Sequence, residues 1–116
     1  MVNIKHSVHT KIWIEDENGE TVLGAGQLEI LNVINDKGSI SAAARAMNMG
    51  YRSMWGKLKK IEKRIGKPLL IRKKGGASGG NSILTFEAKI MVDKFKQLQH
   101  EISKSAEKIF KEKSLF

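Results

Sequence analysis

Residues 38–71 read GSISAAARAMNMGYRSMWGKLKKIEKRIGKPLLI. Two helix-like segments flank a short break at residues 48–50, and Met49 is expected to point inward as the apolar pin of that turn. The first segment, residues 42–47, is rich in alanine and can be capped by Ser39 or Ser41. The pattern is typical of two helices joined by a tight turn, a helix-turn-helix.

The second segment, residues 51–65, has one apolar stripe. Met54, Leu58 and Ile61 recur at helical spacing, and Ile65 continues the series. Pro68 follows closely, and proline cannot continue a helix. Gly56 lies inside the segment, where glycine is less favourable than alanine by roughly 1 kcal/mol. A glycine at this position allows the backbone to come close to another group, such as a phosphate.

Positive charge is concentrated in the same region. Residues 45–74 contain 11 basic side chains and one acid, Glu62, which gives this window a net charge of +10. The whole chain has a net charge of +9, so the remaining residues sum to −1. A localised basic face beside a helix-turn-helix pattern indicates a protein that binds duplex DNA.

Length and composition restrict the alternatives. A chain of 116 residues is the size of one domain, so residues 1–116 are predicted to form a single domain. The absence of cysteine excludes disulfides and thiolate metal sites. No apolar run approaches the ~18 residues of a membrane span, and no signal peptide is evident, which predicts a cytoplasmic protein. A membrane partner is disfavoured, because binding would require an amphipathic helix with a free apolar face.

The N-terminal third predicts a hairpin followed by a helix. Apolar and polar residues alternate over residues 4–15, which is typical of a half-buried strand. Residues 16–19 end in Asn-Gly, a strong turn signal, and residues 20–23 can return as a second strand. A largely buried helix is expected from Gln27 to Asp36, with Gly38 as its left-handed stop.

The C-terminal half predicts a wing and a long helix. Residues 69–71 and 82–84 read as two strands joined by a basic, glycine-rich loop at 72–81. Thr85 can cap a helix over residues 86–110. Apolar residues at four-three spacing along this helix are Met91, Phe95, Leu98, Ile102 and Ile109. Since so small a domain cannot cover a helix of ~25 residues, this stripe is predicted to pair two copies into a homodimer. The expected fold class is α+β, a winged helix-turn-helix.

The quoted residues resemble a known family of regulators. GSISAAARAM and LKKIEKRIGKPLLIR are similar to the N-terminal winged helix of LysR-type regulators. Tyr51-Arg52-Ser53-Met54-Trp55, with the glycines of residues 75–80, resembles more closely the DNA-binding domain of the molybdate-responsive ModE regulators, over roughly residues 4–110. The resemblance implies DNA binding and dimerisation. Full-length ModE proteins also carry an oxyanion-sensing module, which is not evident up to Phe116. No cofactor is therefore expected, and a separately encoded oxyanion-sensing protein is a conceivable partner.

A recognition helix enters the major groove through its N-terminal residues, and the wing contacts the flanking backbone. Arg52 can bind guanine in a bidentate manner. Tyr51 and Trp55 have an alternative, which is to pack on the side of the preceding helix. Ser39 and Ser41 could bind a phosphate as well as cap the helix that follows them. The candidate contacts with double-stranded DNA are Ser39, Ser41, Tyr51, Arg52, Ser53, Trp55, Lys57, Lys60, Arg72, Lys73 and Lys74.

Other functions have weaker support. The basic run could be a solvated face, although such faces usually mix charges of both signs. His6, His9 and His100 form no helical pair and no HExxH motif, so no metal site and no catalytic residues are proposed. The glycine-rich loop lacks the lysine of a P-loop. The remaining alternative is a winged-helix module that binds a separately encoded sensor protein.

Overall fold

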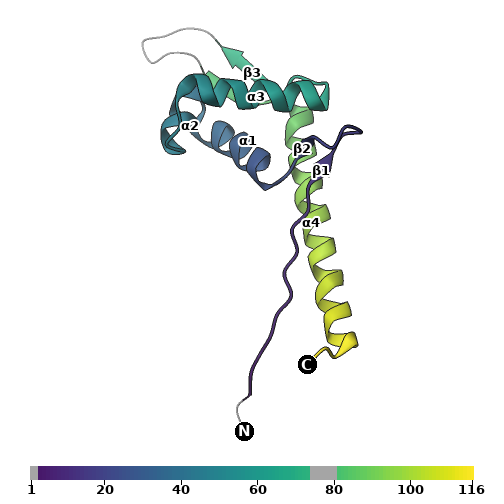
Figure 1. The fold of residues 1–116 in the computed structure, drawn as a ribbon. Helices are drawn as coiled ribbons and strands as arrows, with labels where there is room; N and C mark the ends of the chain where they lie inside the picture. The colour runs from purple at the N-terminus through teal and green to yellow at the C-terminus, as the bar shows by residue number, and fades with distance from the viewer. Residues whose placement is uncertain (1–2, 74–80) are drawn as a thin grey trace.

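The computed structural model describes residues 3–73 and 81–116. The elements follow in the order β1 (Ile14–Glu15), β2 (Thr21–Leu23), α1 (Ala25–Lys37), α2 (Ile40–Ala46), α3 (Tyr51–Ile65), β3 (Leu70–Lys73), β4 (Asn81–Leu84) and α4 (Phe86–Lys113). Helices α1, α2 and α3 pack together, and α3 lies at the edge of the molecule away from the free end of α4 (Figure 1). The fold is the predicted α+β winged helix.

The helix ends follow the chemistry of single residues. Gly38 and Gly66 end α1 and α3 with φ values of 78° and 81°, in the left-handed region that favours glycine. The side chain of Ser39 accepts a hydrogen bond from the Ala42 amide at 3.0 Å, so Ser39 caps α2 rather than Ser41. Thr85 accepts from the Ala88 amide at 3.1 Å and begins α4, as predicted.

The strand predicted for residues 4–15 is wrong over most of its length. Only Ile14 and Glu15 form β1, which pairs antiparallel with β2, while residues 3–13 form an extended, mostly exposed arm. The predicted turn is confirmed, because the Gly19 amide donates to the Asp16 carbonyl at 3.0 Å. The return strand β2 has only 3 residues before α1 begins, so it can pair with only the end of the arm.

Several element boundaries also differ from the predictions. Helix α1 begins at Ala25, two residues before the predicted Gln27, and α4 ends at Lys113 rather than residue 110. Helix α2 runs from Ile40 to Ala46, with Met47 at its end. The wing strands extend to Lys73 and back to Asn81, so residues predicted in the loop belong to strands. Frayed helix ends and short strands are the parts of a fold that local pattern defines least.

One hydrophobic core connects the helices, β2 and the wing. Leu31 of α1, Met54 and Leu58 of α3, and Leu69 before β3 are almost completely buried. Met49 packs against this core in the turn between α2 and α3, as predicted. The wing is tied to α1 by the Ser82 amide, which donates to the Gly38 carbonyl at 2.6 Å. The core therefore holds α3 and the wing in a fixed relation to each other.

The long helix continues beyond this core. The buried residues of α4 end at Phe95, although the helix has 28 residues, which corresponds to roughly 42 Å. The arm and α4 extend from the core on the same side, and the rings of His6 and Phe116 stack at 4.5 Å (Figure 1). The radius of gyration is 18.3 Å, against roughly 13 Å for a compact domain of this length. The larger part of α4, beyond Phe95, thus projects from the core.

Candidate nucleic-acid interface

Helix α3 has three different sides around its buried stripe. Successive residues are turned by about 100° around a helix, so Arg52, Gly56 and Lys63 lie opposite the buried Met54, Leu58 and Ile61. Lys59 and Lys60 border the same outward side, and all of these residues are exposed. No acidic residue lies on this side, because the single acid of the helix, Glu62, is turned toward the wing. The outward side of α3 is therefore uniformly basic and open to solvent.

The wing covers one flank of α3. The Leu69 amide donates to the Glu62 carboxylate at 2.7 Å, which fixes the start of the wing against the end of the helix. Arg72 in β3 lies over the ring of Trp55, with 4.0 Å from its guanidinium carbon to the ring centroid. Lys59 approaches the same ring at 5.3 Å. Cations at these distances are attracted by the face of an indole.

Trp55 thus lies on the wing side of α3, where it is half-buried beneath Lys59 and Arg72. Tyr51 is 51% exposed in the first turn of α3 and meets Trp55 edge to face at 6.3 Å. Arg52 and Ser53 are exposed in the same turn. The N-terminal turn of α3 therefore has several polar side chains available to a ligand, and Trp55 connects that turn to the wing.

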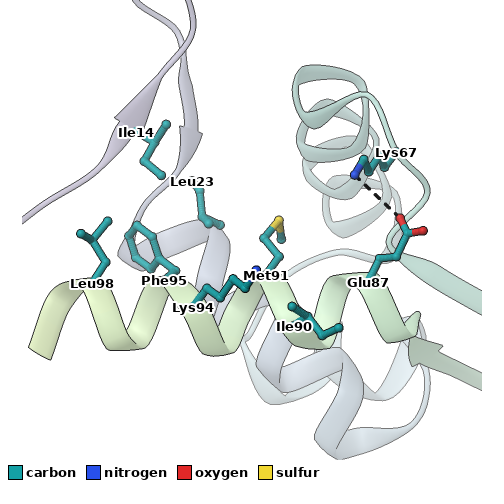
Figure 2. A pocket seen from close by; sticks show the side chains of 9 residues that line it. All are labelled: Ile14, Leu23, Lys67, Glu87, Ile90, Met91, Lys94, Phe95 and Leu98. Atoms are coloured by element: carbon teal, nitrogen blue, oxygen red, sulfur yellow. Dashed lines mark ion pairs between the residues drawn. The ribbon is translucent and has the colours of Figure 1, made fainter.

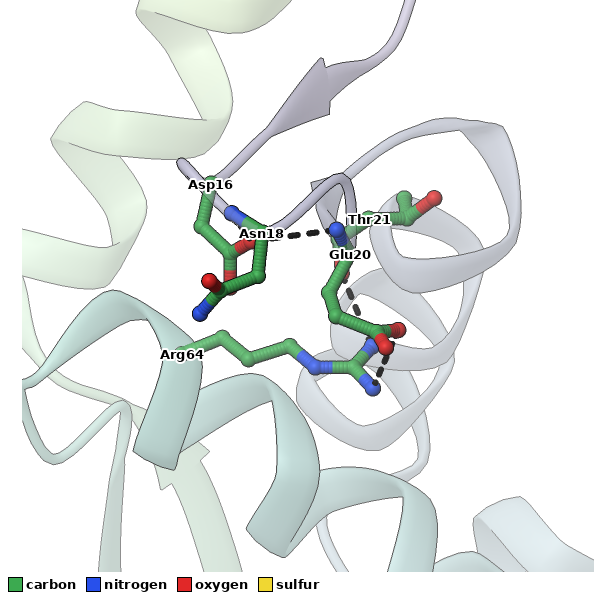
Figure 3. A network of polar contacts seen from close by, with 5 residues as sticks. All are labelled: Asp16, Asn18, Glu20, Thr21 and Arg64. Atoms are coloured by element: carbon green, nitrogen blue, oxygen red, sulfur yellow. Dashed lines mark hydrogen bonds and ion pairs between the residues drawn. The ribbon is translucent and has the colours of Figure 1, made fainter.

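The β1–β2 hairpin covers the opposite flank of α3. Arg64 donates to the Thr21 carbonyl at 2.9 Å and to the Glu20 carboxylate at 3.3 Å (Figure 3). Asp16 accepts hydrogen bonds from the amides of Asn18 and Glu20, which shapes the turn beside this contact. Arg64 therefore anchors the hairpin to α3. No local pattern could reveal this role, because its partners lie 43 and 44 residues away.

The structure places some of the predicted DNA contacts on the outward side of α3 and others around it. Arg52, Ser53 and Lys60 belong to the outward side of α3. Arg72 of β3 lies over Trp55 on the wing flank of α3. Lys73, the next strand residue, is exposed on the opposite face of the wing. Lys57 is exposed toward the hairpin flank. Lys74 lies outside the described residues. Ser41 is exposed in the first turn of α2, whereas the hydroxyl of Ser39 is occupied by the cap.

An apolar groove of about 450 Å³ lies at the other end of the core. Figure 2 shows Ile14 and Leu23 of the hairpin facing Met91, Phe95 and Leu98 of α4. An ion pair between Lys67 and Glu87, at 3.9 Å, closes one end of the groove. Phe95, predicted as a dimer contact, is only 3% exposed and belongs mainly to the protomer core, whereas Leu98 and Ile109 are 40% and 51% exposed. Ile102 is half-buried.

Known proteins were compared with this chain. Residues 25–88 match the family described as "Bacterial regulatory helix-turn-helix protein, lysR family". The chain belongs to this family. The match begins at α1 and ends in the first turn of α4, so it covers the helix-turn-helix and the wing.

The similarity to ModE proteins is also confirmed. This LysR-family chain is 26% identical over 94 residues to the molybdenum transport protein ModE of Azotobacter vinelandii, covering 81% of this chain and 35% of that protein. It is 33% identical over 73 residues to the transcriptional regulator ModE of Haemophilus influenzae, covering 63% of this chain and 29% of that protein. The molybdenum-pterin-binding protein MopB of Rhodobacter capsulatus is 33% identical to this chain over 63 residues, covering 54% of this chain and 23% of MopB. The chain thus spans about a quarter to a third of the length of these relatives.

Solved structures show the same fold. The BenM DBD in its complex with benA site 1 DNA superposes with a TM-score of 0.54 at 14% identity, covering 81% of this chain and all of that chain. ArgP from Mycobacterium tuberculosis superposes with a TM-score of 0.53 at 19% identity, covering 76% of this chain and 31% of ArgP. At these identities the likeness establishes the winged-helix fold of this LysR-family chain.

Among residues 3–73 and 81–116, no cluster of three or more histidine, aspartate or glutamate side chains could hold a metal ion. Over the same described residues, no helix is both long and apolar enough to span a membrane.

Proposed function

We propose that this chain is a sequence-specific regulator of transcription that binds double-stranded DNA as a homodimer in the cytoplasm. It has no enzymatic role in this proposal, and residues 1–116 act as one domain. Helix α3 enters the major groove, and the wing contacts the flanking backbone. Membership of a family of helix-turn-helix regulators supports the general assignment.

The observation that carries the proposal is the outward side of α3. Arg52, Lys59, Lys60 and Lys63 are exposed there, and the acid of the same helix is bonded to the wing. Neutralising phosphates with such cations releases counterions from DNA, which drives association without regard to sequence. Arg52 is in the N-terminal turn, the part of a recognition helix that reaches base edges. It is therefore our candidate for reading guanine.

The stacking of Arg72 on Trp55 supports a role for the wing. A side chain as long as arginine loses conformational freedom when it binds, and this loss weakens the interaction. The contact with the indole at 4.0 Å already restricts Arg72 beside α3. Arg72 and the adjacent Lys73 could then contact backbone phosphates next to the groove that α3 enters.

The projecting part of α4 supports the dimer. The spacing of four and three residues that includes the partly buried Met91 and the core residue Phe95 continues to Leu98 and Ile102, beyond the point where the core ends. Two such helices can bury these side chains against each other. A second copy is the occupant we propose for the exposed stripe and for the adjoining groove, since the groove is continuous with the stripe at Leu98. A two-fold dimer would bind a pseudo-palindromic site.

Selection of bound sequences from random duplex DNA tests this function. We expect a pseudo-palindromic motif whose half-site spacing reports the dimer. The affinity for the selected duplex should fall steeply between about 50 and 200 mM salt, because several phosphate contacts are lost together. Recovery of no motif, or an affinity that does not change over this salt range, would contradict the proposal. A protein partner that binds tightly, with no selection of DNA, would instead favour the alternative of a winged-helix module that binds a separately encoded sensor protein.

A further inference from the structure

Neither the backbone conformation nor the packing of the described residues requires a glycine at position 56. Gly56 is inside α3, and its φ is not in the left-handed region. Among the described residues, and apart from the adjoining backbone of α3 itself, a Cβ atom built at Gly56 would meet no other atom within 4 Å. By contrast, Gly38 and Gly66 have positive φ values, and a Cβ at Gly24 would approach the Cβ of Trp13 to 3.1 Å. Alanine at position 56 would therefore fit the protein and would favour the helix more than glycine does.

The location of Gly56 points to a ligand outside the chain. Neighbours on a helix surface are three and four residues apart, so Gly56 is surrounded by Arg52, Ser53, Lys59 and Lys60. All four side chains are exposed. Gly56 is thus a gap in the middle of the basic outward side of α3, directly opposite the buried stripe.

The dimensions of DNA make such a gap consequential. The major groove is roughly 12 Å wide, and a helix with its side chains is roughly 10–12 Å across. A recognition helix therefore fits with little space to spare. Removing one side chain from the side that faces the groove floor allows the helix axis to move closer to the bases, and glycine is the residue that permits such close approach.

We propose that Gly56 is the point at which α3 comes closest to the base edges of the duplex, and that its missing side chain sets how deeply α3 enters the major groove. The insertion depth in turn determines whether Arg52, one turn earlier, reaches the bases. Gly56 is therefore a specificity-determining position that acts through the absence of a side chain. This inference rests on the DNA binding proposed above.

Substitution of Gly56 separates this role from a structural one, because stability and binding should change in opposite directions. Gly56→Ala should raise the Tm by about 3–5 °C through its helix propensity. The same variant should bind the duplex selected by the parent roughly ten- to a hundredfold more weakly, the range for one lost base contact. Gly56→Leu should weaken binding further. The dependence of affinity on salt should be unchanged, because no charge is removed.

Gly26 provides the matched control. It is also an exposed glycine in a helix, α1, and a Cβ there would likewise meet no atom of the described part of the chain within 4 Å, its own helix backbone aside. Gly26→Ala should not lower the Tm and should bind the selected duplex as tightly as the parent. If Gly56→Ala also binds as tightly as a parent that selects DNA, the role of Gly56 is overturned while the proposed function stands. If the parent selects no duplex, the proposed function fails, and this inference fails with it.

Discussion

Arg52 and Arg64 have the same charge and belong to the same helix, but the fold gives them different surroundings. Arg52 is exposed in the first turn of α3, on the outward side. Arg64 is turned toward the hairpin and binds the Thr21 carbonyl and Glu20. Their separation by twelve residues along α3 places them on different sides of the helix. Position around the helix, rather than charge, decides which arginine is open to solvent and which is bonded to the hairpin.

At the scale of single residues we predict that Arg52→Ala reduces discrimination between the selected duplex and a duplex mismatched at one base pair by roughly 1–3 kcal/mol. The reason is the loss of a bidentate contact with guanine. Lys73→Ala should cause a smaller loss that is the same for every sequence, because a phosphate contact carries no sequence information. Competition binding with matched and mismatched duplexes measures both effects.

Arg64→Ala is the control for charge, since it removes the same charge from the same helix. It should retain the site preference and lower the Tm, because the hairpin loses its anchor. If Arg52→Ala keeps the site preference of the parent, Arg52 does not read a base.

Among the elements, α2 depends most on its cap. It has only 7 residues, too few to be stable as an isolated helix. Ser39 satisfies the Ala42 amide, and Ala43 and Ala44 bury the inner face against the core. The placement of α3 follows from that of α2, since only the turn through Met49 separates them.

We predict that Ser39→Ala lowers the free energy of unfolding by about 1 kcal/mol, the usual effect of losing a serine cap. Urea denaturation monitored by circular dichroism measures the change. Ser41→Ala is the matched control, because Ser41 is exposed and follows the start of the helix. Equal effects of the two substitutions would show that the cap contributes little to stability.

The whole molecule is extended by the part of α4 beyond Phe95. The overall dimensions are 65 × 35 × 23 Å, and α3 lies away from the free end of α4 (Figure 1). The surfaces that we propose for DNA binding and for dimerisation therefore lie at opposite ends of the molecule. A second copy on α4 would leave the basic side of α3 open.

We predict that Leu98→Glu converts the dimer to a monomer, because the new carboxylate would be buried between two helices. Sedimentation at micromolar concentration measures the change, and the affinity for the palindromic duplex should fall with it. Lys104→Glu is the control, since Lys104 is exposed on the far side of α4 from the stripe. A parent that sediments as a monomer under these conditions would refute the proposed dimer.

The positions of the helices were determined by the sequence alone, because local chemistry specifies them. Apolar spacing in α3, glycine after α1 and α3, and threonine before α4 act within a few residues of their targets. The resemblance to LysR-type and ModE regulators was also readable, because it depends on these same residues. The strand predicted for residues 4–15 was wrong over most of its length, because a strand depends on a partner elsewhere in the chain and not on local chemistry alone. Alternation at residues 4–15 indicates a surface for pairing, but the strand that pairs with this segment in the described part of the chain is β2, and β2 is short.

The surroundings of each side chain were decided only by the tertiary structure. Residues 38–71 contain the basic helix, but their spacing does not say which flank meets the wing and which meets the hairpin. That choice depends on contacts such as Arg72 with Trp55 and Arg64 with Thr21, whose partners are distant in sequence. The same packing leaves Gly56 facing outward, where an added Cβ would meet no other described residue within 4 Å. A local pattern shows that α3 has a basic side, and only the packed molecule shows where that side is open.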